Sequence, residues 1–385
     1  MGKVKLGFVV NNLVMGGVSK VLINLCNSLD PEKYDIHLLI LSGDLEMEKI
    51  NPLNDHIKKH LFNYKFSSKY DLITYLKNSF SYRSTYIRAK EVLQVISDLN
   101  LDILHFHTLP RQLVIGILAK KTNPGLKLVF TDHSARISKD QYNWYQEFLL
   151  SIAYKRLYHN YNLIAVSKAV SHYIKSHGLS NGKLKFEMLE NSISIADYGR
   201  SKSLKDSKQQ FIYISRINNE KGHDVLIEAW LKLDHKNKGQ LVIIGPDETS
   251  GDVPKLAQNN KSIVFTGSVS DVKTYLDNST IAVFPSKKEG LPLALLEMMA
   301  FELPVIVSDI DELTSIVSHE KEGLHFKLDD SNDLVEKMEL LLNNQELAIK
   351  LGGKARTKVE EICEKNDPVK FHDVFYNELL NKMNV

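Results

Sequence analysis

The chain has 385 residues, of which 43% are hydrophobic and 25% charged, and its formal net charge is +2. This length is too great for one ordinary domain and suits two packed cores. Its two cysteines, Cys26 and Cys363, argue against a disulfide framework and fit a reducing compartment. Because no stretch approaches the roughly 18 apolar residues of a transmembrane helix and no signal peptide precedes the first strand, we expect a cytoplasmic protein.

Short apolar runs alternate with helical patterns along both halves of the chain, which is typical of βαβ units and parallel sheets. In the first half we expect strands at residues 6–10, 36–41, 103–106, 128–131 and 163–166. In the second half we expect them at residues 211–215, 240–244, 263–266, 281–285 and 304–307. The polar stretch 201–210 has no apolar period and predicts a domain boundary, and residues 368–383 predict an amphipathic final helix.

Gly16 and Gly17 follow the first predicted strand and precede a predicted helix. Two glycines at such a turn let the backbone approach a ligand closely. The G-x-G-x-x-G spacing of a dinucleotide site is absent, so the pair alone is weak evidence for binding. Ser19 follows two residues after Gly17, and its structural explanation is that it caps the helix.

Histidines mark the ends of two later strands of the first half. His105 and His107 lie two residues apart, so strand alternation places them on the same face. We do not expect zinc there, because no third and fourth ligands follow at a usual spacing. His107 is better explained as a core residue, or as a residue that positions a neighbouring site residue. Asp132 and His133 come just past the next strand. His133 is either a satisfied polar group at a strand end or a ligand-binding residue, and we favour the second interpretation.

Two cations follow the first strand of the second half. Arg216 and Lys221 lie on the loop between the predicted strand 211–215 and a helix that begins near Asp224. Open α/β sheets bind ligands at the carboxyl ends of their strands. Two cations at such a loop can neutralise a diphosphate without a metal. We expect both side chains on an exposed loop, and the simpler alternative is an ordinary pair of surface cations.

Two glutamates stand eight residues apart after a later strand. Glu289 lies in a loop with Gly290 and Pro292, and Glu297 lies in an apolar run that predicts a buried helix. Free N–H groups at the start of that helix suit an anionic group, and a carboxylate on an apolar helix needs a polar partner such as a sugar hydroxyl. A solvated loop glutamate and an ion-paired helix glutamate are the alternative.

The segments SRINNEKG (215–222) and EGLPLALLEMMA (289–300) together resemble the donor-site signature of the retaining GT-B glycosyltransferases of family 4. The resemblance implies that Arg216 and Lys221 hold the diphosphate, that Glu289 contacts the donor sugar and that Glu297 contacts the ribose. The resemblance also implies that His133 lies near the donor sugar. The catalytic residues that it implies are His133, Glu289, Arg216 and Lys221, and it implies further contacts at the donor site. Those further contacts are Gly16, Gly17, Gly267, Val269, Gly290, Leu291 and Pro292.

The same resemblance implies a fold of two Rossmann-like domains with parallel sheets that face each other across a cleft. Residues 1–200 would form the acceptor-binding domain, residues 201–367 the nucleotide-sugar-binding domain, and residues 368–385 a helix that crosses back to the first domain. No metal or other cofactor is implied. Asp309 and Asp311 form a D-x-D, which binds metal in other glycosyltransferases, but its position after a strand favours a turn.

The activity implied is retaining transfer of a hexose or N-acetylhexosamine from a nucleotide-diphosphate sugar, expected to be UDP-linked. The acceptor expected is a lipid-linked glycan in the synthesis of a bacterial capsule or similar surface polysaccharide. Two alternatives stay open. One is a GT-B enzyme that acts on a small soluble acceptor, and the other is a non-catalytic module that binds a nucleotide sugar.

The first domain is the basic one. Residues 1–200 contain 26 Lys and Arg against 17 Asp and Glu, although the whole chain is nearly neutral. Between Lys58 and Lys90 the basic residues are mixed with aromatic ones, which suits an anionic membrane surface. A solvated set of helix faces would explain the same composition. No nucleic-acid-binding motif accompanies the charge, so we expect no nucleic-acid partner.

Overall fold

The structure, a computed structural model, divides into two compact units: Met1–Asn191 with Pro368–Val385, and Ser192–Asp367. The first boundary therefore falls before residue 201, and the final helix belongs to the first unit. The structure describes residues 2–13, 17–42, 45, 52–64, 86–87, 89–108, 112–133, 144–190, 192–193, 195, 198–199, 209–233, 239–269, 271–289 and 292–381, without the side chains of 144–150 and 169.

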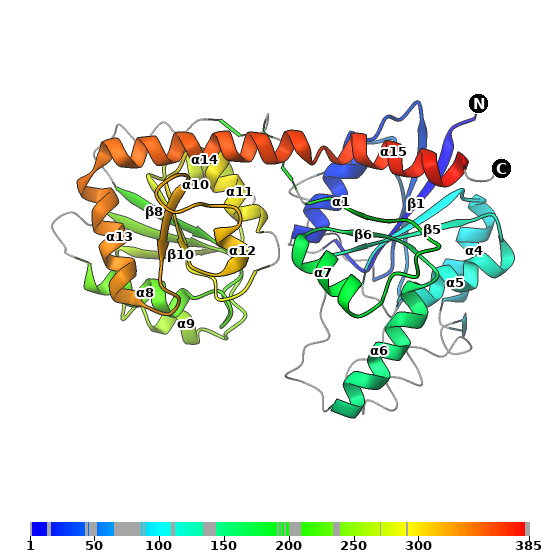
Figure 1. Cartoon of the computed structure of the whole chain (residues 1–385), viewed down its shortest axis with the longest axis horizontal. Helices are drawn as coiled ribbons and strands as arrows, with labels where there is room; N and C mark the ends of the chain where they lie inside the picture. The colour runs from blue at the N-terminus through cyan, green and yellow to red at the C-terminus, as the bar shows by residue number, and fades with distance from the viewer. Residues whose placement is uncertain are drawn as a thin grey trace. The chain divides into compact units, whose positions relative to one another are not determined.

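The first unit is a parallel sheet with helices packed on it (Figure 1). Its seven described strands lie in the order β3-β2-β1-β4-β5-β6-β7. The strands are β1 (Val4–Val10), β2 (Tyr34–Ile40), β3 (Lys58–Leu61), β4 (Ile103–His107), β5 (Lys127–Asp132), β6 (Asn162–Ala165) and β7 (Phe186–Met188). The helices are α1 (Gly17–Ser28), α4 (Lys90–Leu99), α5 (Leu113–Thr122), α6 (Trp144–Tyr158), α7 (Lys168–Ser176) and α15 (Pro368–Asn381).

Helix α15 is part of the core of the first unit although it follows the second unit in sequence. Phe375 and Tyr376 are fully buried in the same hydrophobic cluster as Leu22 and Cys26 of α1. The hydroxyl of Tyr34 donates a 2.6 Å hydrogen bond to Asp373 of α15. Burying two large aromatic side chains stabilises the docking by roughly 3–6 kcal/mol, so α15 is a fixed component of this unit.

The second unit is another parallel sheet, with six described strands in the order β10-β9-β8-β11-β12-β13. The strands are β8 (Gln210–Ile214), β9 (Gln240–Ile244), β10 (Ile263–Gly267), β11 (Ile281–Phe284), β12 (Val305–Ser308) and β13 (Gly323–Phe326). The helices are α8 (His223–Lys232), α9 (Asp252–Lys255), α10 (Val272–Asp277), α11 (Leu293–Ala300), α12 (Asp311–Thr314), α13 (Ser331–Asn343) and α14 (Gln345–Lys365).

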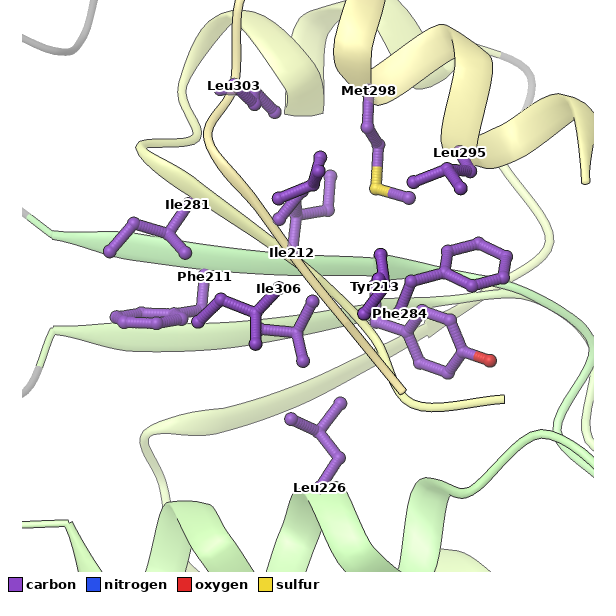
Figure 2. Close-up of a cluster of buried hydrophobic side chains, with 14 of the residues drawn as sticks. Phe211, Ile212, Tyr213, Leu226, Ile281, Phe284, Leu295, Met298, Leu303 and Ile306 are labelled. Atoms are coloured by element: carbon purple, nitrogen blue, oxygen red, sulfur yellow. The ribbon is translucent and has the colours of Figure 1, made fainter. Parts of the chain in front are cut away.

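Apolar side chains fill both faces of this second sheet (Figure 2). Leu226 of α8 reaches it from one side, and Leu295 and Met298 of α11 reach it from the other. Strands covered on both faces need apolar residues at nearly every position, which is why the sequence shows these strands as continuous apolar runs. The parallel α/β architecture of both halves is therefore confirmed.

The strand order of the second unit reverses between β8 and β11. The chain runs outward from β8 to β10 and then restarts at β11 on the other side of β8. Open α/β sheets usually bind ligands at such a reversal of strand order, at the carboxyl ends of the strands. Arg216 and Lys221 lie on the loop after β8 and Glu289 on the loop after β11.

Among the described residues, no helix combines the length and apolar character needed to cross a bilayer.

Candidate functional site

The loop between β8 and α8 is pressed against the loop between β11 and α11 at Gly222. Gly222 has φ +65°, and a Cβ added there would lie 1.9 Å from the carbonyl oxygen of Pro285. The hydroxyl of Tyr213, at the end of β8, donates to the carbonyl oxygen of Lys221 at 2.8 Å and lies 2.9 Å from the hydroxyl of Ser286. Only glycine fits this close approach, which holds the residues of the two loops side by side.

Lys221 and Glu289 form an ion pair between these two loops. The Lys221 Nζ lies 2.5 Å from Glu289 Oε1, and the side chains are only 15% and 9% exposed. The same Nζ donates to the carbonyl oxygen of Lys288 at 3.4 Å. Burial corrects the expectation that Lys221 lies on an exposed loop. A cation and a carboxylate withdrawn from water require each other, because an unpaired buried charge is costly.

Arg216 has the exposed position that the sequence predicts, with a side chain that is 56% exposed. Its Nη1 donates to Glu248 Oε1 at 2.9 Å, and Asn218 Nδ2 donates to Glu248 Oε2 at 3.0 Å. Glu248 was not among the residues predicted for the site. The available signal was its position just past β9, since the loops after neighbouring parallel strands meet at one edge of the sheet.

Glu297 lies in the middle of α11 and is 5% exposed, as expected for a carboxylate on a buried apolar helix. Pro292 is the N-cap of this helix. Gly267 ends β10 with φ +66°, and Val269 after it packs partly buried against the core. Gly290 and Leu291 lie outside the described residues.

A buried histidine follows the Arg216 loop at the start of α8. His223, at the start of α8, is 1% exposed, and its Nε2 lies 3.3 Å from the Ser215 hydroxyl. Burial lowers the pKa of His223 to about 4. The ring is therefore neutral at physiological pH, and the cationic groups contributed by this loop are Arg216 and Lys221.

In the first unit, the predicted histidines lie together at the carboxyl ends of β4 and β5, with His105 and His107 buried and His133 partly buried. His107 Nδ1 lies 3.0 Å from His133 Nε2, and the rings of His105 and His107 are 4.4 Å apart. His105 contacts the Tyr376 hydroxyl at 2.6 Å and the Thr131 hydroxyl at 2.7 Å. Because both of its ring nitrogens have hydrogen-bonding partners, His105 serves the core and the docking of α15.

His133 is a neutral hydrogen-bonding group at physiological pH. Burial lowers its pKa to about 4, and it lies just after Asp132, whose carboxylate accepts a 2.7 Å hydrogen bond from Tyr158. Gly17 is the first residue of α1, and Gly16 lies outside the described residues. The structure thus pairs Lys221 with Glu289 in the second unit and places Arg216 on the same loop as Lys221, while His133 and Gly17 lie in the first unit.

No group of His, Cys, Asp or Glu in the described part of the chain is arranged to hold a metal ion. The D-x-D carboxylates have other positions: Asp309 accepts a 2.8 Å hydrogen bond from the backbone N–H of Leu328, and Asp311 lies in the first turn of α12. The Asp309 bond therefore joins the segment after β12 to the segment after β13.

Two family models match the chain, one in each unit. The model described as Glycosyltransferase Family 4 matches residues 15–186, and the model described as Glycosyl transferases group 1 matches residues 196–358. An uncharacterized glycosyltransferase of Haemophilus influenzae is 24% identical over 367 residues, which cover 93% of this chain and 96% of that protein. A second relative is the N,N'-diacetylbacillosaminyl-diphospho-undecaprenol alpha-1,3-N-acetylgalactosaminyltransferase of Campylobacter jejuni. It is 31% identical over 151 residues, 39% of this chain and 40% of its own length.

The same fold occurs in solved glycosyltransferase structures. Anabaena Alr3699/HepE in complex with UDP and glucose matches with a TM-score of 0.76 at 16% identity, over 98% of this chain and 99% of its own. At this identity the likeness establishes the fold, which is GT-B. Because consecutive family models match the two units and a relative matches over nearly its whole length, the chain belongs to the family 4 glycosyltransferases of the GT-B fold.

Proposed function

We propose that this chain is a retaining hexosyl- or N-acetylhexosaminyltransferase that uses a UDP-linked sugar. The observation that carries the proposal is the Lys221–Glu289 ion pair, with Arg216 on the same loop as Lys221, at the point where the strand order of the second sheet reverses. A cation next to a carboxylate can bind both parts of a nucleotide sugar: the cation takes the diphosphate and the carboxylate takes a sugar hydroxyl. Glu297, buried on the following helix, would hold the ribose.

The chemistry assigned to these residues is mainly electrostatic. The bond between the sugar C1 and the diphosphate oxygen breaks while the acceptor hydroxyl attacks from the same face, and a diphosphate oxygen takes the hydroxyl proton. Arg216 and Lys221 would stabilise the charge that develops on the leaving diphosphate. Glu289 would orient the sugar, and the neutral His133 would donate or accept a hydrogen bond near it. No side chain is assigned as a nucleophile, and no metal or other cofactor is invoked.

Two relatives support the choice of substrates. The Anabaena structure holds UDP and glucose, which favours a uridine nucleotide as donor. The Campylobacter jejuni relative acts, by its name, on a sugar carried by diphospho-undecaprenol. We therefore take a lipid-linked glycan as the acceptor class, in the synthesis of a bacterial surface polysaccharide such as a capsule.

A panel of nucleotide sugars tested by thermal shift, followed by a transfer assay on the best binder, tests this proposal. A ligand present at 100 times its Kd should stabilise the native state by about 2.7 kcal/mol. NMR of the product should show the donor's anomeric configuration retained, and EDTA should leave the rate unchanged. Inversion of the anomer or strict dependence on a divalent ion would contradict the mechanism. Donor binding without hydrolysis or transfer would indicate the non-catalytic module, and transfer confined to small soluble acceptors would indicate the other alternative.

We also propose that the basic part of the first unit docks on an anionic membrane surface. Lys58 and Lys59 lie on the edge strand β3, where Lys58 is 55% exposed and paired with Asp35 at 2.6 Å. Lys65 and Lys69 lie outside the described residues. Each cation near an anionic leaflet adds about 1 kcal/mol, and salt screens that attraction.

Reversal of Lys58, Lys59, Lys65 and Lys69 to Glu should therefore abolish sedimentation with vesicles that contain anionic lipid, while turnover on a soluble acceptor analogue is kept. The wild type should also leave the vesicles as salt rises. The control reverses four exposed lysines of the second unit: Lys255, Lys261, Lys350 and Lys354. Equal binding of the wild type to neutral and anionic vesicles, or no binding to either, would refute docking.

A further inference from the structure

Glu248 is held beside Arg216 by the backbone. The N–H of Ile217 donates to the carbonyl oxygen of Pro246, and the N–H of Glu248 donates to the carbonyl oxygen of Ile217, both at 2.9 Å. These two bonds join the loop after β9 to the loop after β8. Neither involves a side chain, so the Cα of Glu248 stays next to Arg216 whatever its carboxylate contacts.

Both oxygens of the Glu248 carboxylate accept hydrogen bonds, but its ion pair with Arg216 is weak. Its two oxygens accept from Arg216 at 2.9 Å and from Asn218 at 3.0 Å. The Arg216 and Glu248 side chains are 56% and 40% exposed, so the strength of their ion pair is small and screened by salt. A bound diphosphate can therefore draw the guanidinium away from this carboxylate. The negative charge nevertheless remains nearby, because the backbone does not move with the side chain.

We propose that Glu248 is a charge-selective residue of the donor site, which weakens binding of the free nucleoside diphosphate more than binding of the intact nucleotide sugar. The inference rests on the proposed function, because it takes Arg216 to be a diphosphate ligand. It adds a carboxylate whose effect is to favour release of the nucleotide product.

The selectivity follows from the charge of the two ligands. In a nucleotide sugar each of the two phosphates carries one negative charge, since both are esterified. When the bond to the sugar breaks, the terminal phosphate becomes a monoester-type group with a second pKa of about 6, so at neutral pH it gains most of another charge. Repulsion from a fixed carboxylate grows in proportion to the ligand's charge, and the product is therefore repelled more than the substrate.

The test compares Glu248→Gln with the wild type by titration calorimetry at low and high salt. The probes are UDP, inorganic pyrophosphate and the nucleotide sugar that best stabilises the wild type. Gln keeps the shape of the side chain and an oxygen that accepts from Arg216, but removes the charge. We expect the Kd of UDP to fall by about three- to tenfold, the Kd of the nucleotide sugar to fall less, and both changes to shrink as salt rises. Product inhibition by UDP should increase in step.

The matched control is Glu360→Gln. Glu360 forms a similar ion pair in the same unit, with Arg356 Nε at 2.9 Å, and is 48% exposed. Arg356 also donates to the carbonyl oxygen of Ala300, at the opposite end of α11 from Pro292, so this pair lies away from the proposed site. Its loss should leave all three Kd values unchanged.

The outcomes separate this inference from the function on which it rests. Weaker UDP binding in Glu248→Gln would show that the carboxylate positions Arg216 instead, and an equal gain for UDP and the nucleotide sugar would remove the selectivity. Either result overturns the inference and leaves the proposed function standing. Failure of the wild type to bind UDP, pyrophosphate and every nucleotide sugar would overturn both.

Discussion

Replacing Lys221 with alanine should lower sugar transfer about ten- to a hundredfold, because one charge-assisted contact worth roughly 1.5–3 kcal/mol to the leaving diphosphate is lost. The same variant should also be less stable. Removal of the Lys221 ammonium group leaves the carboxylate of Glu289, which is 9% exposed, without its cation. Removing one partner of a buried ion pair costs about 3–5 kcal/mol of stability. For a unit of this size, a loss of about 3 kcal/mol lowers the Tm by about 6–12 °C.

Arg216→Ala separates the two effects. Its side chain is 56% exposed and its partner Glu248 is 40% exposed, so the pair should contribute no more than about 1 kcal/mol to stability. Transfer should fall about as far as in Lys221→Ala, since the same class of diphosphate contact is lost, but the Tm should stay near that of the wild type.

Removing both members of the buried pair provides a second control. Lys221→Met with Glu289→Gln leaves no unpaired charge, so it should recover most of the lost Tm without recovering transfer. If Arg216→Ala combined with Lys221→Ala kept activity within a few-fold of the wild type, the assignment of these cations to the diphosphate would be wrong. An unchanged Tm in Lys221→Ala would show that Glu289 does not depend on Lys221 for its buried position.

Most strands were predictable because a strand covered on both faces must be apolar throughout. Three strands were not predicted. Lys58–Leu61, at the edge of the first sheet, consists of two lysines, a histidine and a leucine. The other two, Phe186–Met188 and Gly323–Phe326, are only three and four residues long. Short or edge strands need little apolar surface, so their sequences lack the pattern by which the inner strands were found.

The site was predictable as a set of residue types and less so as a set of contacts. The sequence placed Arg216 and Lys221 on one loop and Glu289 on another, but the pairing of Lys221 with Glu289 joins positions 68 residues apart. Glu248 was missed for a related reason: its role depends on which loop lies beside the β8 loop, and that follows from the strand order β9-β8-β11. Loop contacts of this kind are set by sheet topology, which periodicity does not reveal.

Gly222→Ala should strongly destabilise the second unit, and Gly267→Ala is its matched control. The two glycines have nearly the same backbone conformation, with φ +65° and +66°. A side chain in this region costs roughly 1–2 kcal/mol at either position. The surroundings differ, because a Cβ at Gly267 meets nothing within 4 Å, whereas one at Gly222 would lie 1.9 Å from the Pro285 oxygen.

Backbone atoms at Pro285 cannot rotate away, so in Gly222→Ala the loops after β8 and β11 must move apart. We expect an added loss of about 1–3 kcal/mol from this overpacking, and lower transfer because Lys221 and Glu289 lie on the two displaced loops. The chain has two tryptophans, so a Trp144→Phe background leaves the fully buried Trp230 as the fluorescent reporter of the second unit during urea unfolding. The midpoint should fall further for Gly222→Ala than for Gly267→Ala. Equal midpoints would mean that the contact with Pro285 does not restrict residue 222, and that hydrogen bonds and the Lys221–Glu289 pair hold the two loops together without it.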